Sequence, residues 1–141
     1  MAALDEIRRR EALLLAEHLE TTETSAPDLI RAIWGWIAAP ERAPFLRLFF
    51  EVYVQAANHP EAYSVRGRAM ITDWLVQFSA GLSNSRAESA DPAFTTLVIA
   101  VLRGLLLDRL STDDHARTDD ALERFALLVD SMGLDASHAQ S

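Results

Sequence analysis

The residues of this sequence that could take part in chemistry are polar side chains within otherwise apolar helical stretches. Arg103 interrupts the apolar run over 92–111, and His18 shares the apolar face of a helix expected over about 3–20. A buried arginine needs an anionic partner or several hydrogen-bond acceptors. Arg103 could therefore bind an acidic ligand, pair with a carboxylate of the chain such as Glu11, or lie at a subunit interface. His18 fits either a ligand contact or a half-buried histidine with a partner inside the protein.

The sequence lacks the patterns that support catalysis or metal binding. Its four histidines are far apart, and no two stand at the spacing of metal ligands on one helical face. Asp119 and Glu123 are one helical turn apart on a face expected to be in water, so they do not form an acid–base pair. Residues 113–115 fit a solvated helix cap better than a weak cation site, and the five glycines form no phosphate-binding loop. We expect no enzyme activity, no metal and no cofactor.

Composition and charge narrow the class of protein further. The 141 residues include 21 acidic and 13 basic side chains, and the net charge of −8 argues against nucleic-acid binding by these residues alone. Cysteine is absent, which excludes disulfides and thiolate metal sites and fits a cytoplasmic protein. Arg103 interrupts the best candidate for a membrane span, and the N-terminal residues have helical periodicity unlike a signal peptide. We therefore expect a cytoplasmic domain without membrane contact.

Helix signals dominate the chain and strand signals are almost absent, so we expect an all-α fold of about six helices in a compact array. Proline and capping residues mark several boundaries, such as Ser25 before Pro27. The expected helices span about 3–20, from the Ser25 cap to before Pro40, from Pro44 to Asn58, 60–82, 92–111, and from Asp113 or Asp114 to Met132–Gly133. One domain over 1–133 and a flexible tail over 134–141 complete the expected organisation.

Aromatic side chains concentrate in the three middle helices, where they could enclose a ligand. Small-molecule pockets are mostly apolar with a few placed polar groups, which matches aromatic stripes accompanied by isolated polar residues. The same stripes also fit a solid hydrophobic core. The hypothesis of a cavity assigns seven residues to ligand binding, namely His18, Trp34, Phe49, Tyr53, Trp74, Phe78 and Arg103.

The fifth expected helix is apolar almost all the way round, whereas the sixth is apolar on one face. Small residues at i, i+4 and i+8 of the fifth helix would allow another helix to approach closely. Doubling both helices by two-fold symmetry would bury a four-helix interface, and packing of both inside a monomer is the alternative. The expected homodimer interface contains Thr96, Ala100, Gly104, Leu107, Ala121, Phe125 and Leu128.

Four strings of residues resemble the tetracycline-repressor-type (TetR-type) regulators. Leu102–Leu110, Ser111–Asp114 and Arg117–Leu122 resemble the last two helices of that family, and Leu4–Glu11 resembles the helix that leaves its DNA-binding domain. The resemblance implies an all-helical effector-binding and dimerisation domain of a repressor. A small, largely hydrophobic effector, with an acidic group as one option, would then release operator DNA. The family's three-helix DNA-binding domain would precede Leu4, so operator DNA is an expected partner only through that further domain.

Two other functions remain open from the sequence. A helical interaction protein without a DNA-binding domain could heterodimerise with an intact regulator. The second alternative is a small-molecule carrier or a small helical enzyme that uses the same aromatic cavity, although no set of residues supports catalysis.

Overall fold

The computed structural model describes residues 6, 10, 13, 25–62, 65, 69 and 92–132, and the backbone alone over 133–139. Every regular element within these residues is helical and none is a strand, which confirms the all-α prediction. The helices expected over 3–20 and 60–82 lie largely outside the described residues. The few residues described inside those two ranges are helical.

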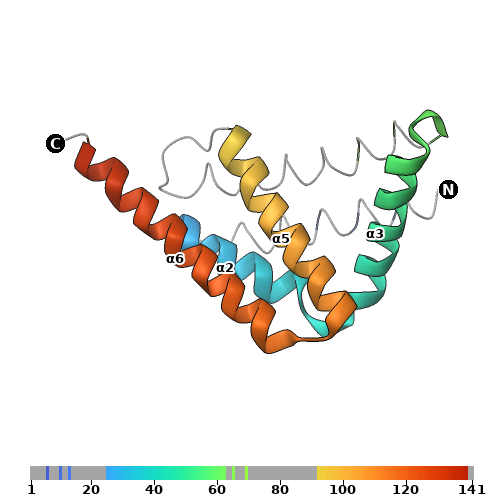
Figure 1. The fold of residues 1–141 in the computed structure, drawn as a ribbon, viewed down its shortest axis with the longest axis horizontal. Helices are drawn as coiled ribbons and strands as arrows, with labels where there is room; N and C mark the ends of the chain where they lie inside the picture. The colour runs from blue at the N-terminus through green and yellow to red at the C-terminus, as the bar shows by residue number, and fades with distance from the viewer. Residues whose placement is uncertain are drawn as a thin grey trace.

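The described elements are four α-helices and one short 3-10 helix. In chain order they are α2 (Ala26–Ile37), η1 (Pro40–Arg42), α3 (Ala43–Asn58), α5 (Pro92–Thr112) and α6 (His115–Ala139). Helix α2 packs against α6, α5 packs against both α6 and α3, and η1 joins α2 to α3. Figure 1 shows α5 and α6 diverging from the turn that joins them, with α2 beside α6 and α3 on the other side of α5.

Local sequence signals explain where the helices begin. The Ser25 hydroxyl accepts a hydrogen bond from the Asp28 backbone N–H at 3.4 Å, and Pro27 occupies the first turn of α2. Pro44 lies in the first turn of α3, and α5 begins at Pro92. Helix α2 ends at Ile37, before Pro40, as expected from the sequence.

The centre of the core is the buried face of α2. Leu29, Ile30, Ile33 and Ile37 recur at helical spacing and are at most 2 % exposed. Helix α3 adds Leu46, Phe49 and Phe50, and α5 adds Val98, Ile99, Leu102 and Leu106. Helix α6 adds Leu122 and Val129. Among the described helices, none is long and apolar enough to cross a membrane.

The turn between α5 and α6 is short and tightly capped. Asp113 has a φ of 56°, a left-handed conformation that aspartate tolerates better than most residues. The Asp114 side chain accepts a hydrogen bond from the Arg117 backbone N–H at 3.2 Å, so Asp114 provides the cap that the sequence assigned to it or Asp113.

Helix α6 continues past its expected end. The sequence predicts an end at Met132–Gly133, but the helix runs to Ala139. That expectation is wrong because glycine permits a left-handed terminating conformation without enforcing it. Alanine and leucine follow Gly133 and favour the helix.

Candidate functional site

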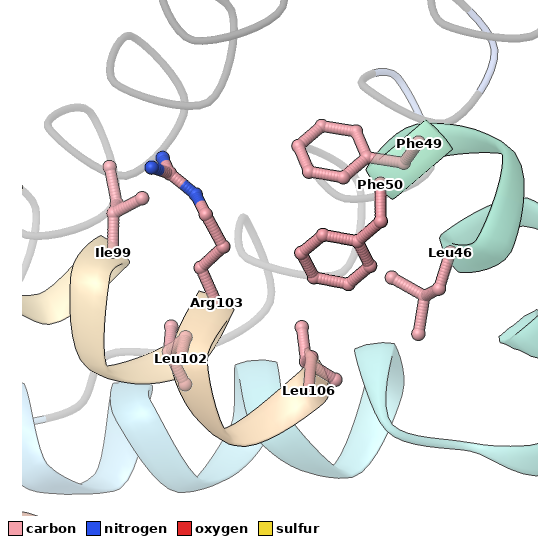
Figure 2. Close-up of a pocket in the computed structure, with 7 residues that line it drawn as sticks. All are labelled: Leu46, Phe49, Phe50, Ile99, Leu102, Arg103 and Leu106. Atoms are coloured by element: carbon pink, nitrogen blue, oxygen red, sulfur yellow. The ribbon is translucent and has the colours of Figure 1, made fainter. Parts of the chain in front are cut away.

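A pocket lies between α3 and α5 (Figure 2). Its cavity volume is about 20 Å³, room for roughly one water molecule, and the pocket is partly open to solvent. Its walls are Leu46, Phe49 and Phe50 from α3 and Ile99, Leu102, Arg103 and Leu106 from α5. Arg103 is the one polar residue among these seven, and the surface that faces the pocket is entirely apolar.

The spacing of the lining residues explains how two helices form this pocket. On α3, residues 46, 49 and 50 stand at i, i+3 and i+4, and on α5 residues 99, 102, 103 and 106 follow the same rule. Such residues share one helical face, so each helix turns one stripe toward the other. The sequence assigned Phe49 and Arg103 to a pocket, and the structure brings both to this one. The leucine and isoleucine residues of the lining were not predicted from the sequence, because the spacing of apolar residues does not distinguish a cavity wall from a solid core.

Aromatic rings continue along α3 from the pocket. Phe49 and Phe50 meet edge to face, with ring centroids 5.4 Å apart and an interplanar angle of 83°. Tyr53, one turn beyond Phe49, has its ring nearly parallel to that of Phe49 at 6.4 Å. The Tyr53 ring therefore borders the pocket lining, although it is not part of the wall itself.

Arg103 contacts Tyr53 in two ways. Its Nη1 donates a hydrogen bond to Tyr53 Oη at 3.2 Å, and its Cζ lies 5.0 Å from the centre of the tyrosine ring. Arg31, Arg109 and Arg117 each form an ion pair with a described carboxylate, and no ion pair between described residues involves Arg103. The half-buried guanidinium therefore has a neutral phenol as its described partner. Glu11, the carboxylate considered from the sequence, lies outside the described residues.

Trp34 lies at the contact of α2 with α6 and does not line the pocket. Its side chain is 6 % exposed, and its Nε1 donates a hydrogen bond to Asp119 Oδ1 at 2.7 Å. Arg109 Nη1 donates to the same oxygen at 2.9 Å and lies near the Trp34 ring. Asp119, expected in water, is exposed but accepts both bonds. His18, Trp74 and Phe78 lie outside the described residues.

Two further arginine clusters tie helices together at the surface. Arg31 of α2 donates to both carboxylate oxygens of Glu123 of α6, at 2.9 and 2.7 Å, which lowers the pKa of Glu123 below its ordinary value. Arg117 of α6 bonds to Asp108 of α5 and to Asp114, and its hydrogen bonds lower the pKa of Asp108. These contacts join helices and do not surround a cavity.

The residues expected at a dimer interface are mostly uncovered in this single chain. Thr96, Ala100, Gly104, Leu107, Ala121 and Leu128 are exposed, and Phe125 is partly buried against the core. Leu107 and Leu128 are 50 % and 57 % exposed. A Cβ atom added at Gly104 would meet no other atom within 4 Å, so the small residue leaves open space on this face.

A second hollow lies where η1 meets the turn after α5. Arg47, Arg109, Asp113 and His115 contribute its polar groups. Arg109 is paired with Asp119, and His115 Nε2 lies 2.8 Å from Asp113 Oδ1. The cavity volume of this hollow, about 130 Å³, exceeds that of the pocket between α3 and α5, although most of its ionic groups already have partners.

The described residues hold no group of three or more histidine, aspartate or glutamate side chains that could bind a metal ion. No protein family, curated protein or solved structure matches the chain. The resemblance to tetracycline-repressor-type regulators therefore rests on the sequence strings quoted above. The structural features that bear on function are the pocket and the exposed faces of α5 and α6.

Proposed function

We propose that this chain is the effector-binding and dimerisation part of a tetracycline-repressor-type transcriptional repressor. The observation that carries the proposal is the apolar surface on both sides of α5. One side packs into the core and lines the pocket, and the other exposes Leu97, Ala100, Gly104 and Leu107. A helix with two apolar sides in a chain of this size is best used between its own domain and a partner.

A homodimer is the partner that fits this exposed side. The exposed residues of α5 recur every three or four positions, with two small residues between two leucines, which suits close helix packing. Helix α6 adds Ala121, Leu128 and Met132 at similar spacing, all exposed. Two copies related by a two-fold axis would cover both stripes with one four-helix contact.

The pocket supplies the effector site of the proposed regulator. Its wall residues on α5 alternate with the exposed stripe on the same helix, so ligand and partner subunit would act on α5 from different sides. A ligand that prefers one arrangement of α5 would change the relation of the two subunits, by no more than its differential affinity for the two states. In the proposed repressor that change releases operator DNA. DNA binding itself is assigned to a helix-turn-helix domain, since the net charge of −8 disfavours phosphate contacts by these residues.

Size-exclusion chromatography with light scattering tests the dimer. We expect a dimer at micromolar concentration, and a monomer for Leu107→Glu because the substitution places a charge in the interface core. Val54→Glu is the matched control: Val54 is 52 % exposed on α3, against 50 % for Leu107, and lies outside the stripe. A wild-type chain that stays monomeric at high micromolar concentration would contradict the proposal. Equal behaviour of the two variants would place the interface elsewhere.

A further inference from the structure

We propose that the hollow between η1 and the α5–α6 turn binds a compact monocarboxylate, a molecule with one ring or a short branched chain and a single carboxylate. The apolar part would lie against a wall of alanine, proline and leucine, and the carboxylate would bond to Arg47 and Arg109. The inference goes beyond the proposed function, which makes no use of this hollow.

The hollow forms where the chain changes direction between α2 and α3. Figure 1 shows η1, which joins these two helices, next to the C-terminal end of α5. The apolar part of the wall consists of Ala38, Ala39, Pro40, Ala43, Leu46, Leu106 and Leu110. The cavity volume is about 130 Å³, close to that of an engineered cavity of about 150 Å³ that binds benzene in another protein. A single ring therefore fits the apolar part of this hollow.

Arg109 lines the hollow with N–H groups that can still donate. Its three described hydrogen bonds, to His115 O, Thr118 Oγ1 and Asp119 Oδ1, all start from Nη1. Among the described residues, no buried polar side-chain atom lacks a hydrogen-bond partner. Because Nε and Nη2 of Arg109 have no partner among these residues, both nitrogens must be accessible to solvent.

Nε and Nη2 form the edge of a guanidinium that binds a carboxylate through two parallel hydrogen bonds. Arg31 uses this edge in the same protein, since its Nε and Nη2 donate to the two carboxylate oxygens of Glu123 at 2.9 and 2.7 Å. Arg109 can therefore offer the corresponding edge to a carboxylate in the hollow.

Arg47 of α3 places a second cation on the wall. Arg47 is exposed, and it forms no ion pair and no side-chain hydrogen bond among the described residues. A carboxylate between the two arginines can accept hydrogen bonds from both. Bonds between charged groups are about twice as strong as bonds between neutral ones, so this arrangement favours an anion.

The other charges near the hollow favour a single negative charge on the ligand. Asp113 is the one carboxylate in the wall, but its side chain is 93 % exposed and its Oδ1 lies 2.8 Å from His115 Nε2. Asp119 pairs with Arg109 from outside the wall. Arg47 is thus the cation left without a described carboxylate, and a monoanion balances it. An amine would be repelled by both arginines, and an alcohol would lack the charge-assisted bonds.

The test compares compounds that share one ring and differ in the polar group. Benzoate, benzyl alcohol and benzylamine are titrated into the whole chain, labelled with nitrogen-15, and the backbone amide shifts report affinity and location. We expect benzoate to bind about tenfold more tightly than benzyl alcohol, the lower end of the range for a hydrogen bond to a charged group, and benzylamine to bind most weakly. The largest shifts should occur within residues 38–47 and 106–115.

Replacing Arg47 tests the contribution of the second cation. Arg47→Gln should weaken benzoate binding several-fold and leave benzyl alcohol binding unchanged. Arg124→Gln is the matched control, because Arg124 is an exposed arginine of α6 outside the wall, and it should change neither affinity.

Filling the hollow tests the space itself. Ala43→Leu adds three carbon atoms to the wall and should weaken benzoate and benzyl alcohol alike, by more than about tenfold. Ala57→Leu is the control, since Ala57 is exposed on the same helix outside the wall. Thermal denaturation checks that both variants fold, and the comparison of Arg47→Gln with Arg124→Gln decides the proposal if Ala43→Leu does not.

Each contrary result has a distinct meaning. Equal affinities for benzoate and benzyl alcohol would overturn the carboxylate assignment. Benzoate binding that persists in Ala43→Leu, or shifts confined to other residues, would overturn the hollow as the site. No shift at millimolar benzoate would overturn the proposal altogether. None of these results bears on the dimer, which light scattering tests separately.

Discussion

Two arginines on α5, six residues apart, lie over aromatic rings in different surroundings. Arg109 lies 5.6 Å from the Trp34 ring centre and also pairs with the Asp119 carboxylate at 2.9 Å. Arg103 lies 5.0 Å from the Tyr53 ring centre and bonds to the tyrosine hydroxyl, with no carboxylate from the described residues. The arginine at the α2–α6 contact is therefore paired with a carboxylate. The arginine at the α3–α5 contact instead lies next to a pocket.

The comparison separates a contact whose polar groups are satisfied from the contact to which the proposed function assigns the ligand. In the α2–α6 contact, the Trp34 indole N–H and the Arg109 guanidinium both donate to the Asp119 carboxylate. These three polar groups therefore already have hydrogen-bond partners within the chain. In the α3–α5 contact, the cation bonds to a neutral phenol and adjoins a small apolar pocket. Substitutions in the first region should therefore change stability, and substitutions in the second should change ligand affinity.

The largest effect on stability is expected at the buried face of α2, at the centre of the core. Ile33 is fully buried on α2, and Ile33→Ala should lower the free energy of unfolding by about 2–5 kcal/mol because it leaves a cavity in the core. Urea denaturation measures this change. Leu127→Ala is the control: Leu127 is more than half exposed, and we expect a change within about 0.5 kcal/mol. A small loss for Ile33→Ala would mean that α2 is not the rigid centre of the fold.

Replacing Trp34 and Tyr53, the aromatic partners of the two arginines, by phenylalanine tests the difference between the two contacts. Trp34→Phe removes the indole donor to Asp119 and should cost about 1–3 kcal/mol in the free energy of unfolding. Tyr53→Phe should cost less than about 1 kcal/mol, because Tyr53 is only partly buried. Chemical denaturation of both variants measures the two changes. A larger loss for Tyr53→Phe than for Trp34→Phe would contradict this difference between the two contacts.

Two helical glycines allow a smaller test. Gly35 and Gly104 are exposed within α2 and α5, and a Cβ at either would meet nothing within 4 Å. Each Gly→Ala substitution should stabilise the folded chain by up to about 1 kcal/mol, since alanine favours the helix. Gly104→Ala alone should also weaken dimerisation, because Gly104 lies on the proposed interface. Thermal denaturation and light scattering report the two effects, and equal dimerisation of both variants would argue against close packing at Gly104.

The smallest effect is expected from the surface pair of Arg31 and Glu123. Because Arg31 lowers the pKa of Glu123, the pair stabilises the fold above the ordinary glutamate pKa, and this contribution is lost as pH falls through the lowered value. Glu123→Gln should therefore be slightly less stable than wild type at neutral pH, and the difference should disappear on acidification and shrink with salt. Unfolding curves across the acidic range measure it. A difference that grows toward low pH would contradict this sign.

Much of the fold could be predicted because the deciding interactions are local. The Ser25 cap, the start of α5 at Pro92 and the end of α2 before Pro40 depend on hydrogen bonds and φ restrictions within a few residues. Apolar periodicity likewise identified the all-α class. Gly133 was the exception, because a glycine permits termination without requiring it.

The functional assignments of the aromatic residues depended on tertiary structure. Trp34 and Phe49 both stand in apolar helical stripes, yet Trp34 bonds to Asp119 of α6 and Phe49 lines the pocket. The sequence by itself determined the helices, their apolar faces and the position of Arg103 within one of them. The packing of α3 against α5 decided that Arg103 meets Tyr53 beside a pocket, since a side chain's partner 50 residues away depends on how helices cross and not on spacing along either one.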